Sequence, residues 1–193
     1  MLWSSIATFE NFSIEILSGD GIFYIQYNSQ ILIKSFKIAN YSCSNAEKGC
    51  IFSVVSNSSL IANMISIENI TAIASLMHVD SSTLNLSNIS LGDILINAQS
   101  DPFVITCDLG HLNVFTLLLQ NFYGGVLESD QSFINFSDFS ITMNNYTQSQ
   151  GLFESPLFSI SKSTNFTVKN SVFGNIQSGS SGGVNPLIFM KFA

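Results

Sequence analysis

Residues 31–40 read ILIKSFKIAN, and this stretch decides the fold. Its apolar residues are Ile31, Ile33, Phe36 and Ile38, and Asn40 closes it. Alternation with a period of two is typical of a strand with one buried face, and the two-residue gap between the apolar pairs marks a bend. We therefore expect two short strands that meet at a corner and end on a turn.

The same frame recurs along the chain. With the first apolar residue as position 0, the apolar positions are 0, +2, +5 and +7, and a turn residue follows at +9. Six copies begin at Ile31, Leu60, Leu84, Leu112, Ile134 and Phe166, and a weaker copy begins at Phe9. A third short strand opens eight residues before each of these six starts, at Phe23, Phe52, Leu76, Val104, Val126 and Phe158.

A repeat of this kind predicts a solenoid. One coil cannot bury its apolar face alone, whereas coils stacked in parallel join their apolar rows into one core. We expect an all-β parallel β-helix (β-solenoid) of about seven coils of 22–32 residues, with three short strands per coil and insertions confined to the loop after position +9. A β-sandwich alternates similarly but does not explain a constant frame with insertions at one corner.

We expect residues 1–193 to be a single solenoid segment, a fragment or subunit of a longer array. Neither end of the sequence shows a polar or helical cap, and the start, MLWSSIATF, lacks the basic region of a signal peptide. Open solenoid ends expose strand edges that promote association. The expected partners are therefore further repeats of a longer chain or other copies stacked end to end.

The composition indicates a secreted protein. Charged residues make up only 10% of the chain, against roughly 25% in ordinary soluble domains. Sequons of the form Asn-x-Ser/Thr, which accept N-linked glycans, occur at nine positions. The outward or loop positions of the frame hold six of them, which we expect to carry glycans: Asn57, Asn85, Asn88, Asn135, Asn145 and Asn165.

A column of turn residues is expected at position +9, made of Asn40, Asn69, Asn121 and Asn175. Their side chains should bond the backbone and their stacked neighbours, a structural role. Asn40 and Asn69 are also sequons, but we expect both to be partly buried and bare of glycan. Asn11 is a sequon in a coil too degenerate to phase.

The cysteines agree with an oxidising compartment. Cys43 and Cys50 bracket the short polar segment SNAEKG, so we expect a loop disulfide, with two free thiols as the alternative. Cys107 is left over, either as a buried small hydrophobe or as an intermolecular partner, and we favour burial.

The charge pattern narrows the range of partners. The net charge is −7, Arg is absent, and the six Lys are scattered, so we expect no nucleic acid partner. We also expect no membrane span, because no segment approaches the ~18 apolar residues that one needs.

A column of three aspartates is the strongest candidate site. Asp80, Asp108 and Asp130 each stand four residues before a repeat start, in three consecutive coils, so they should stack about 4.8 Å apart. We favour Asx-turn capping, in which each carboxylate bonds backbone amides two residues on. The alternatives are a Ca²⁺ site, or an acid/base pair with His78 and Glu128 that acts on a glycosidic bond.

The segments INFSDFSITMNN, YGGVLESDQS and GSSGGVN carry a family resemblance. They resemble the Asn-rich, Gly-Gly repeats of polymorphic outer-membrane proteins and protist surface proteins, which belong to the pectin-lyase-like fold. The resemblance implies a right-handed β-helix in an extracellular setting. Enzymes of that fold acting on acidic polysaccharides bring Arg or Lys to the substrate carboxylate, and this chain has no Arg.

We therefore expect a structural protein without catalytic residues or a cofactor, a glycosylated rod within a surface protein or filament. The alternative is a carbohydrate-binding or carbohydrate-cleaving domain that uses the aspartate column.

Overall fold

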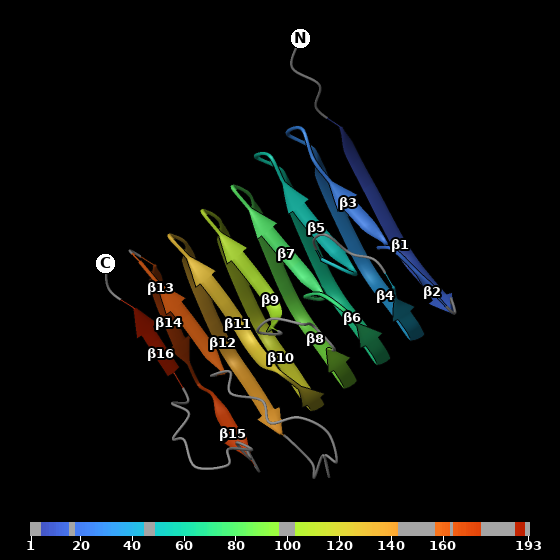
Figure 1. Cartoon of the computed structure of the whole chain (residues 1–193). Coiled ribbons are helices and arrows are strands. Elements are labelled where there is room, and N and C mark those ends of the chain that lie inside the picture. Colours follow the sequence, from blue (N-terminus) through green and yellow to red (C-terminus); the bar gives the residue numbers. More distant parts are fainter. Residues whose placement is uncertain are drawn as a thin grey trace.

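The computed structural model describes residues 5–15, 18–44, 49–96, 103–142, 157–162, 164–174 and 188–191. In these residues every regular element is a strand, and the paired strands are parallel and stacked as a β-solenoid (Figure 1). The expected fold class is confirmed. The variable-loop segments fall largely outside the described residues.

Two sheets form the walls of the solenoid. The long-strand sheet contains β1 (Ile6–Glu15), β4 (Gln30–Cys43), β6 (Ser59–Ala72), β8 (Thr83–Ile96), β10 (His111–Tyr123), β12 (Phe133–Thr142) and β14 (Asn165–Lys169), with β2 (Ser18–Gly19) on β4 and β15 (Val172–Gly174) on β12. The short-strand sheet contains β3 (Phe23–Ile25), β5 (Phe52–Val55), β7 (Met77–Asp80), β9 (Phe103–Asp108), β11 (Gly125–Asp130), β13 (Phe158–Ser161) and β16 (Ile188–Lys191). The chain alternates between the sheets, so each turn adds one strand to both.

About five turns are formed, fewer than the expected seven. They pair an unbroken short strand with an unbroken long strand, from β3 with β4 to β11 with β12. The expected number also included the terminal levels, where the described residues contain no short strand before β1 and the long strand is split into β14 and β15. Three short strands per coil were expected, but backbone pairing continues through the corners and merges two of them into one long bent strand.

The repeat frame matches the pairing of the long strands. Ile31, Leu60, Leu84 and Leu112 are consecutive cross-strand partners, and Ile134 and Phe166 continue the row. The first coil is phased differently from the prediction, because Ile31 pairs with Ala7 and not with Phe9. Asn11 therefore lies at position +4.

The third strand is shifted by one residue in three coils. Met77, Ile105 and Leu127 pair in the row of Phe52, where Leu76, Val104 and Val126 were expected. The cause is the turn between the short and the long strand. It contains two consecutive residues of positive φ in the coils of β3 and β5, but only one in the coils of β7, β9 and β11. Insertions are thus not confined to one loop.

Left-handed residues form the corners of each long strand. At position +9, Asn40, Asn69 and Asn121 have φ of 56°, 54° and 49°, and Asp93 takes the same role. A second corner at position +4 is also left-handed in every coil; its residues are Asn11, Ser35, Met64, Asn88, Thr116, Asp138 and Asn170. Asn and Asp tolerate this conformation better than other L-residues. Asn175 lies outside the described residues.

The interior is mainly apolar, and the buried polar residues in the described part of the chain are serines: Ser53, Ser58, Ser82, Ser129 and Ser132. Positions 0, +2, +5 and +7 are buried throughout the central coils, together with the inward residues of the short strands. Phenylalanine rings pack against one another at both ends of the rod, with Phe12 stacked on Phe36 at 4.6 Å and Phe158 next to Phe166 at 5.4 Å. The predicted disulfide joins Cys43 to Cys50, both buried, and Cys107 is a buried free thiol.

Replacing Thr116 by Asn should stabilise the protein. Thr116 has φ 57°, and positive φ is least favourable for β-branched residues. We expect a gain of about 1 kcal/mol and a melting temperature about 2–4 °C higher, measured by circular dichroism. Thr116→Ala is the control and should gain less, because Ala lacks the local hydrogen bonds that stabilise Asn in this conformation. A lower melting temperature for Thr116→Asn would contradict this account of the corners.

Candidate functional site

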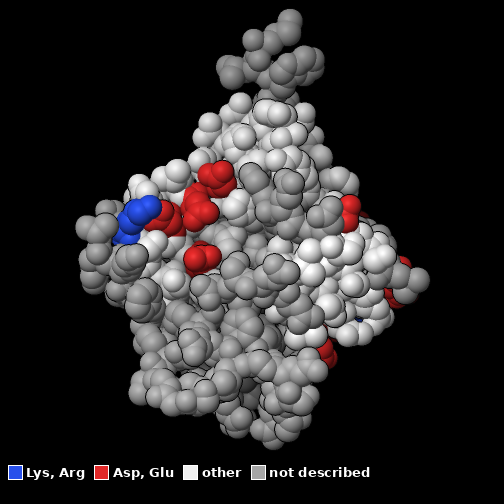
Figure 2. Space-filling view, in the orientation of Figure 1, with Lys and Arg blue, Asp and Glu red and all other residues white. Residues whose placement is uncertain are grey.

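The three aspartates stack on the outer face of the short-strand sheet. Asp108 on β9 pairs in register with Asp80 on β7 and with Asp130 on β11. All three are half-buried, and the residues before them point into the core. In Figure 2 acidic side chains gather on this face beside a basic one, in agreement with the ion pair between Asp130 and Lys162.

The carboxylates of the column differ in their surroundings. Lys162 Nζ donates to Asp130 Oδ2 at 2.7 Å and Ser161 Oγ donates to Asp130 Oδ1 at 3.2 Å, which lowers the pKa of Asp130. Burial raises the pKa of Asp108, and the neighbouring carboxylates of Asp130 and Asp80 raise it further. The column therefore contains one stabilised and one penalised carboxylate on adjacent strands.

Backbone capping by the aspartates is wrong for Asp108 and Asp130. The amide of Gly110, two residues after Asp108, donates to Ser132 Oγ at 3.2 Å. The amide of Ser132, two residues after Asp130, donates to Thr164 Oγ1 at 3.3 Å. The turn itself is made by a left-handed residue directly after each aspartate.

A buried serine ladder takes the place of aspartate capping. Ser29 N donates to Ser58 Oγ at 3.3 Å, and Ser58 N donates to Ser82 Oγ at 3.1 Å. Each hydroxyl thus accepts from the backbone of the preceding coil. In this column Gly110 has no room for a side chain, since a Cβ would lie 2.9 Å from Val79 Cγ1 and 3.0 Å from Ser82 O. Sequence reasoning missed this ladder, although these residues fall at a constant distance before the repeat starts.

His78 and Glu128 lie on the same face as the aspartate column, two coils apart in one row of the short-strand sheet. Thr106 lies between them in the strand register, and its Oγ1 is 2.9 Å from His78 Nδ1. Within the described ranges, no three His, Cys, Asp or Glu side chains are grouped so that they could hold a metal ion.

Asparagine side chains form further ladders on the outer face. The amide nitrogen of one coil donates to the side-chain oxygen of the preceding coil, at 2.6 Å from Asn69 to Asn40 and at 2.8 Å from Asn113 to Asn85. Three more pairs follow the same direction: Asn88 to Asn63, Asn121 to Asp93, and Asn170 to Asp138. The amide ladders thus have one polarity along the rod.

The sequons differ in exposure from the prediction at four positions. Asn40 and Asn69 are exposed, not partly buried, because a left-handed corner turns the side chain outward. Asn85 and Asn135, expected to be accessible, are half-buried on the face of the long-strand sheet. Asn11, Asn57, Asn88 and Asn165 are exposed, and Asn145 lies outside the described residues.

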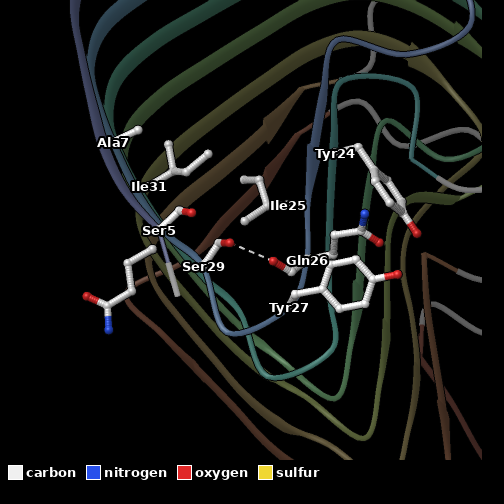
Figure 3. A pocket seen from close by; sticks show the side chains of 9 residues that line it. Ser5, Ala7, Tyr24, Ile25, Gln26, Tyr27, Ser29 and Ile31 are labelled. Carbon is white, nitrogen blue, oxygen red and sulfur yellow. Dashed lines mark hydrogen bonds between the residues drawn. The ribbon is translucent and has the colours of Figure 1, made fainter. Parts of the chain in front are cut away.

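A groove of about 250 Å³ opens at the N-terminal end, between β1 and β3 (Figure 3). Tyr24 and Tyr27 lie on one side of it and Ser5 and Ala7 on the other, and both tyrosines are more than half exposed. Ser29 Oγ donates to Gln26 O at 2.6 Å within its wall. Nothing in the repeat frame predicted this groove.

Comparisons with family models, with curated proteins and with solved structures found no match for this chain. In the described part of the chain, no helix is long and apolar enough to cross a membrane.

Replacing Asp108 by Asn should raise stability at neutral pH. The folded-state pKa of Asp108 is raised, so its ionisation opposes folding as the pH rises above the normal range of a carboxyl group. After allowance for solvent screening, we expect a melting temperature about 1–2 °C above wild type at pH 7 and no difference near pH 3.

Asp130→Asn is the matched control, and its effect should have the opposite sign. The pKa of Asp130 is lowered, so its stabilisation is present at neutral pH and disappears as the pH falls through that lowered pKa. This variant should melt below wild type at pH 7 and equal it in strong acid. Thermal melts of both variants across pH test the pair. Shifts of the same sign at pH 7 would refute this reading of the column.

Proposed function

We propose that the chain is a structural element of an extracellular or surface protein, a rigid glycosylated rod. The coil-to-coil pairing of polar side chains carries this proposal. Asparagine side chains on consecutive coils bond one another along the solenoid axis, and serine hydroxyls accept from backbone amides of the preceding coil, around a mainly apolar core. Polar groups used in this way make the rod stiff.

An extracellular location is supported by two features. The disulfide between Cys43 and Cys50 belongs to an oxidising compartment. Six of the sequons within the described ranges are exposed, so glycans could project from the rod without entering the core. The resemblance to repeats of surface proteins agrees with the same role.

A carbohydrate-binding or carbohydrate-cleaving role is the second candidate. The in-register column of Asp80, Asp108 and Asp130 favours it, since three carboxylates at coil spacing offer repeated acceptors to sugar hydroxyls. Calorimetric titration with CaCl₂ and with neutral oligosaccharides tests this role. Binding that Asp108→Asn abolishes would favour it over the purely structural role.

Glycan occupancy tests the proposed function. In native material, we expect glycans at Asn57, Asn88 and Asn165, and also at Asn40 and Asn69, because all five side chains are exposed. Occupancy should be lower at Asn85 and Asn135, which are half-buried, with Asn85 Oδ1 accepting from Asn113. Peptide mass spectrometry after enzymatic deglycosylation in ¹⁸O-water measures each site.

The two possible failures of this test have different meanings. Absence of glycans at every sequon would remove the main support for an extracellular location. Occupancy at Asn85 and Asn135 with none at Asn40 and Asn69 would instead contradict the exposure that the fold assigns to these residues.

A further inference from the structure

We propose that the two ends of this solenoid are complementary, so that a second copy of the chain stacks on the first head to tail. The inference rests on the proposed structural role and names its partner. The contact would continue the register that the coils have inside one chain.

The strand edges at the two ends match in direction. At one end β1 and β3 are the last strands of the two sheets, and at the other end β14, β15 and β16 are (Figure 1). All pairings between the coils are parallel. A copy stacked head to tail sets β1 beside β14 and β3 beside β16, with the paired strands parallel. A copy stacked head to head would make the paired strands antiparallel.

The apolar residues at the two ends are complementary in size. In the shared frame, Phe166 and Val168 of one copy would face Ala7 and Phe9 of the next, and Ser171 and Phe173 would face Phe12 and Ile14. Each pair sets one phenylalanine against a smaller side chain, as well-packed layers do. Phe9 is 40% exposed and Phe173 38% exposed, so each end face of the described solenoid presents a partly exposed ring.

The charges at position +3 also match. Inside the chain, Lys34 Nζ lies 2.8 Å from Glu10 Oε1, a pair that links adjacent coils. Lys169 holds the same frame position in the last long strand. A stacked copy would place Glu10 one coil, about 4.8 Å, beyond Lys169, which is the relation that Glu10 has to Lys34.

The polarity of the amide ladders gives the same direction. Each ladder bond runs from the Nδ2 of one coil to an oxygen of the coil before it, and Asn170 Nδ2 donates to Asp138 Oδ1 at 3.2 Å. Asn170 Oδ1 is then the acceptor toward the C-terminal end. Asn11, at the same position +4 of the first coil, would supply the next donor in a head-to-tail stack.

The N-terminal groove is explained by the same arrangement. Inside the rod, the corners between short and long strand bond those of the adjacent coil, as Asn28 N does to Ser56 O and Asn57 N to Ser81 O. At the first level the groove is lined by the turn from β3 to β4 and by Ser5 and Ala7, on the end face that a preceding copy would contact.

Phe9→Asp and Phe173→Asp test the proposal, because each variant puts a carboxylate on one end only. Sedimentation velocity over a range of concentrations should show self-association of the wild-type chain, weakened at least tenfold in each variant alone. An equimolar mixture should form a 1:1 heterodimer and stop, since each variant keeps one intact end. Phe115→Asp, an exposed phenylalanine in the middle of the rod, is the control and should associate as wild type does.

Electron microscopy of the wild-type chain gives an independent measure. In the described residues each sheet has seven strands along its path, so one copy should lengthen the rod by about 34 Å without changing its width.

Three results would overturn the proposal: a wild-type monomer at all concentrations, a Phe9→Asp variant that still dimerises through its other end, or association lost in Phe115→Asp alone.

If either end variant fails to fold by circular dichroism, Glu10→Lys and Lys169→Glu replace them. Each should associate about two- to fivefold more weakly alone than in the mixture, and salt should remove this difference. A monomer with occupied sequons would overturn the proposed stacking and leave the proposed function intact. Stacking without glycans would support the proposed stacking and remove the main support for the proposed function.

Discussion

Parallel hydrogen bonding between successive coils, repeated in register, is the constraint on which the rest of the structure depends. Because each strand pairs with its counterpart one coil away, every frame position becomes a column of side chains at a spacing of about 4.8 Å. A side chain must then fit its own position and also the side chains at the same frame position in the two neighbouring coils. The apolar rows satisfy this easily, because Ile, Leu and Phe pack on one another without regard to charge or hydrogen bonding.

Outward columns are more demanding, and they explain the composition. A charge that stacks on a like charge is penalised: burial raises the pKa of Asp108, and the carboxylates of Asp130 and Asp80 on the adjacent strands raise it further. Asparagine avoids this penalty, because one amide both donates and accepts and can therefore bond copies of itself in both directions. A chain with only 10% charged residues and many Asn and Ser is what such stacking favours. The same residues suit the left-handed corners, so Asn meets two requirements at once at Asn40 and Asn69.

The sequence predicted the fold because the core has a strict period. The frame from Ile31 to Asn40 identified the long strands and the turn at position +9, and the position of Cys43 and Cys50 on either side of a short polar segment identified the disulfide. The frame failed where an apolar residue has an apolar neighbour, because a shift of one residue then leaves the pattern unchanged. Leu76 was expected in the row of Phe52, but Met77 beside it is equally apolar and occupies that row. The frame also failed for polar partners. The hydroxyl of Ser132 accepts from Gly110 in the preceding coil, a contact set by three-dimensional stacking that no local pattern reveals.

The two ends of the rod and its sides expose different kinds of groups. Along the axis, the ends present strand edges and partly open rings such as Phe9 and Phe173, which favour the addition of another coil. Across the axis, the corners present exposed sequons such as Asn40 and Asn88, where a bulky glycan would project away from the stack. Glycans placed there would keep rods from adhering side by side while leaving the ends free to join. The proposed glycosylation and the proposed stacking are therefore compatible, because the same corner that turns a sequon outward also directs the next strand back onto the core.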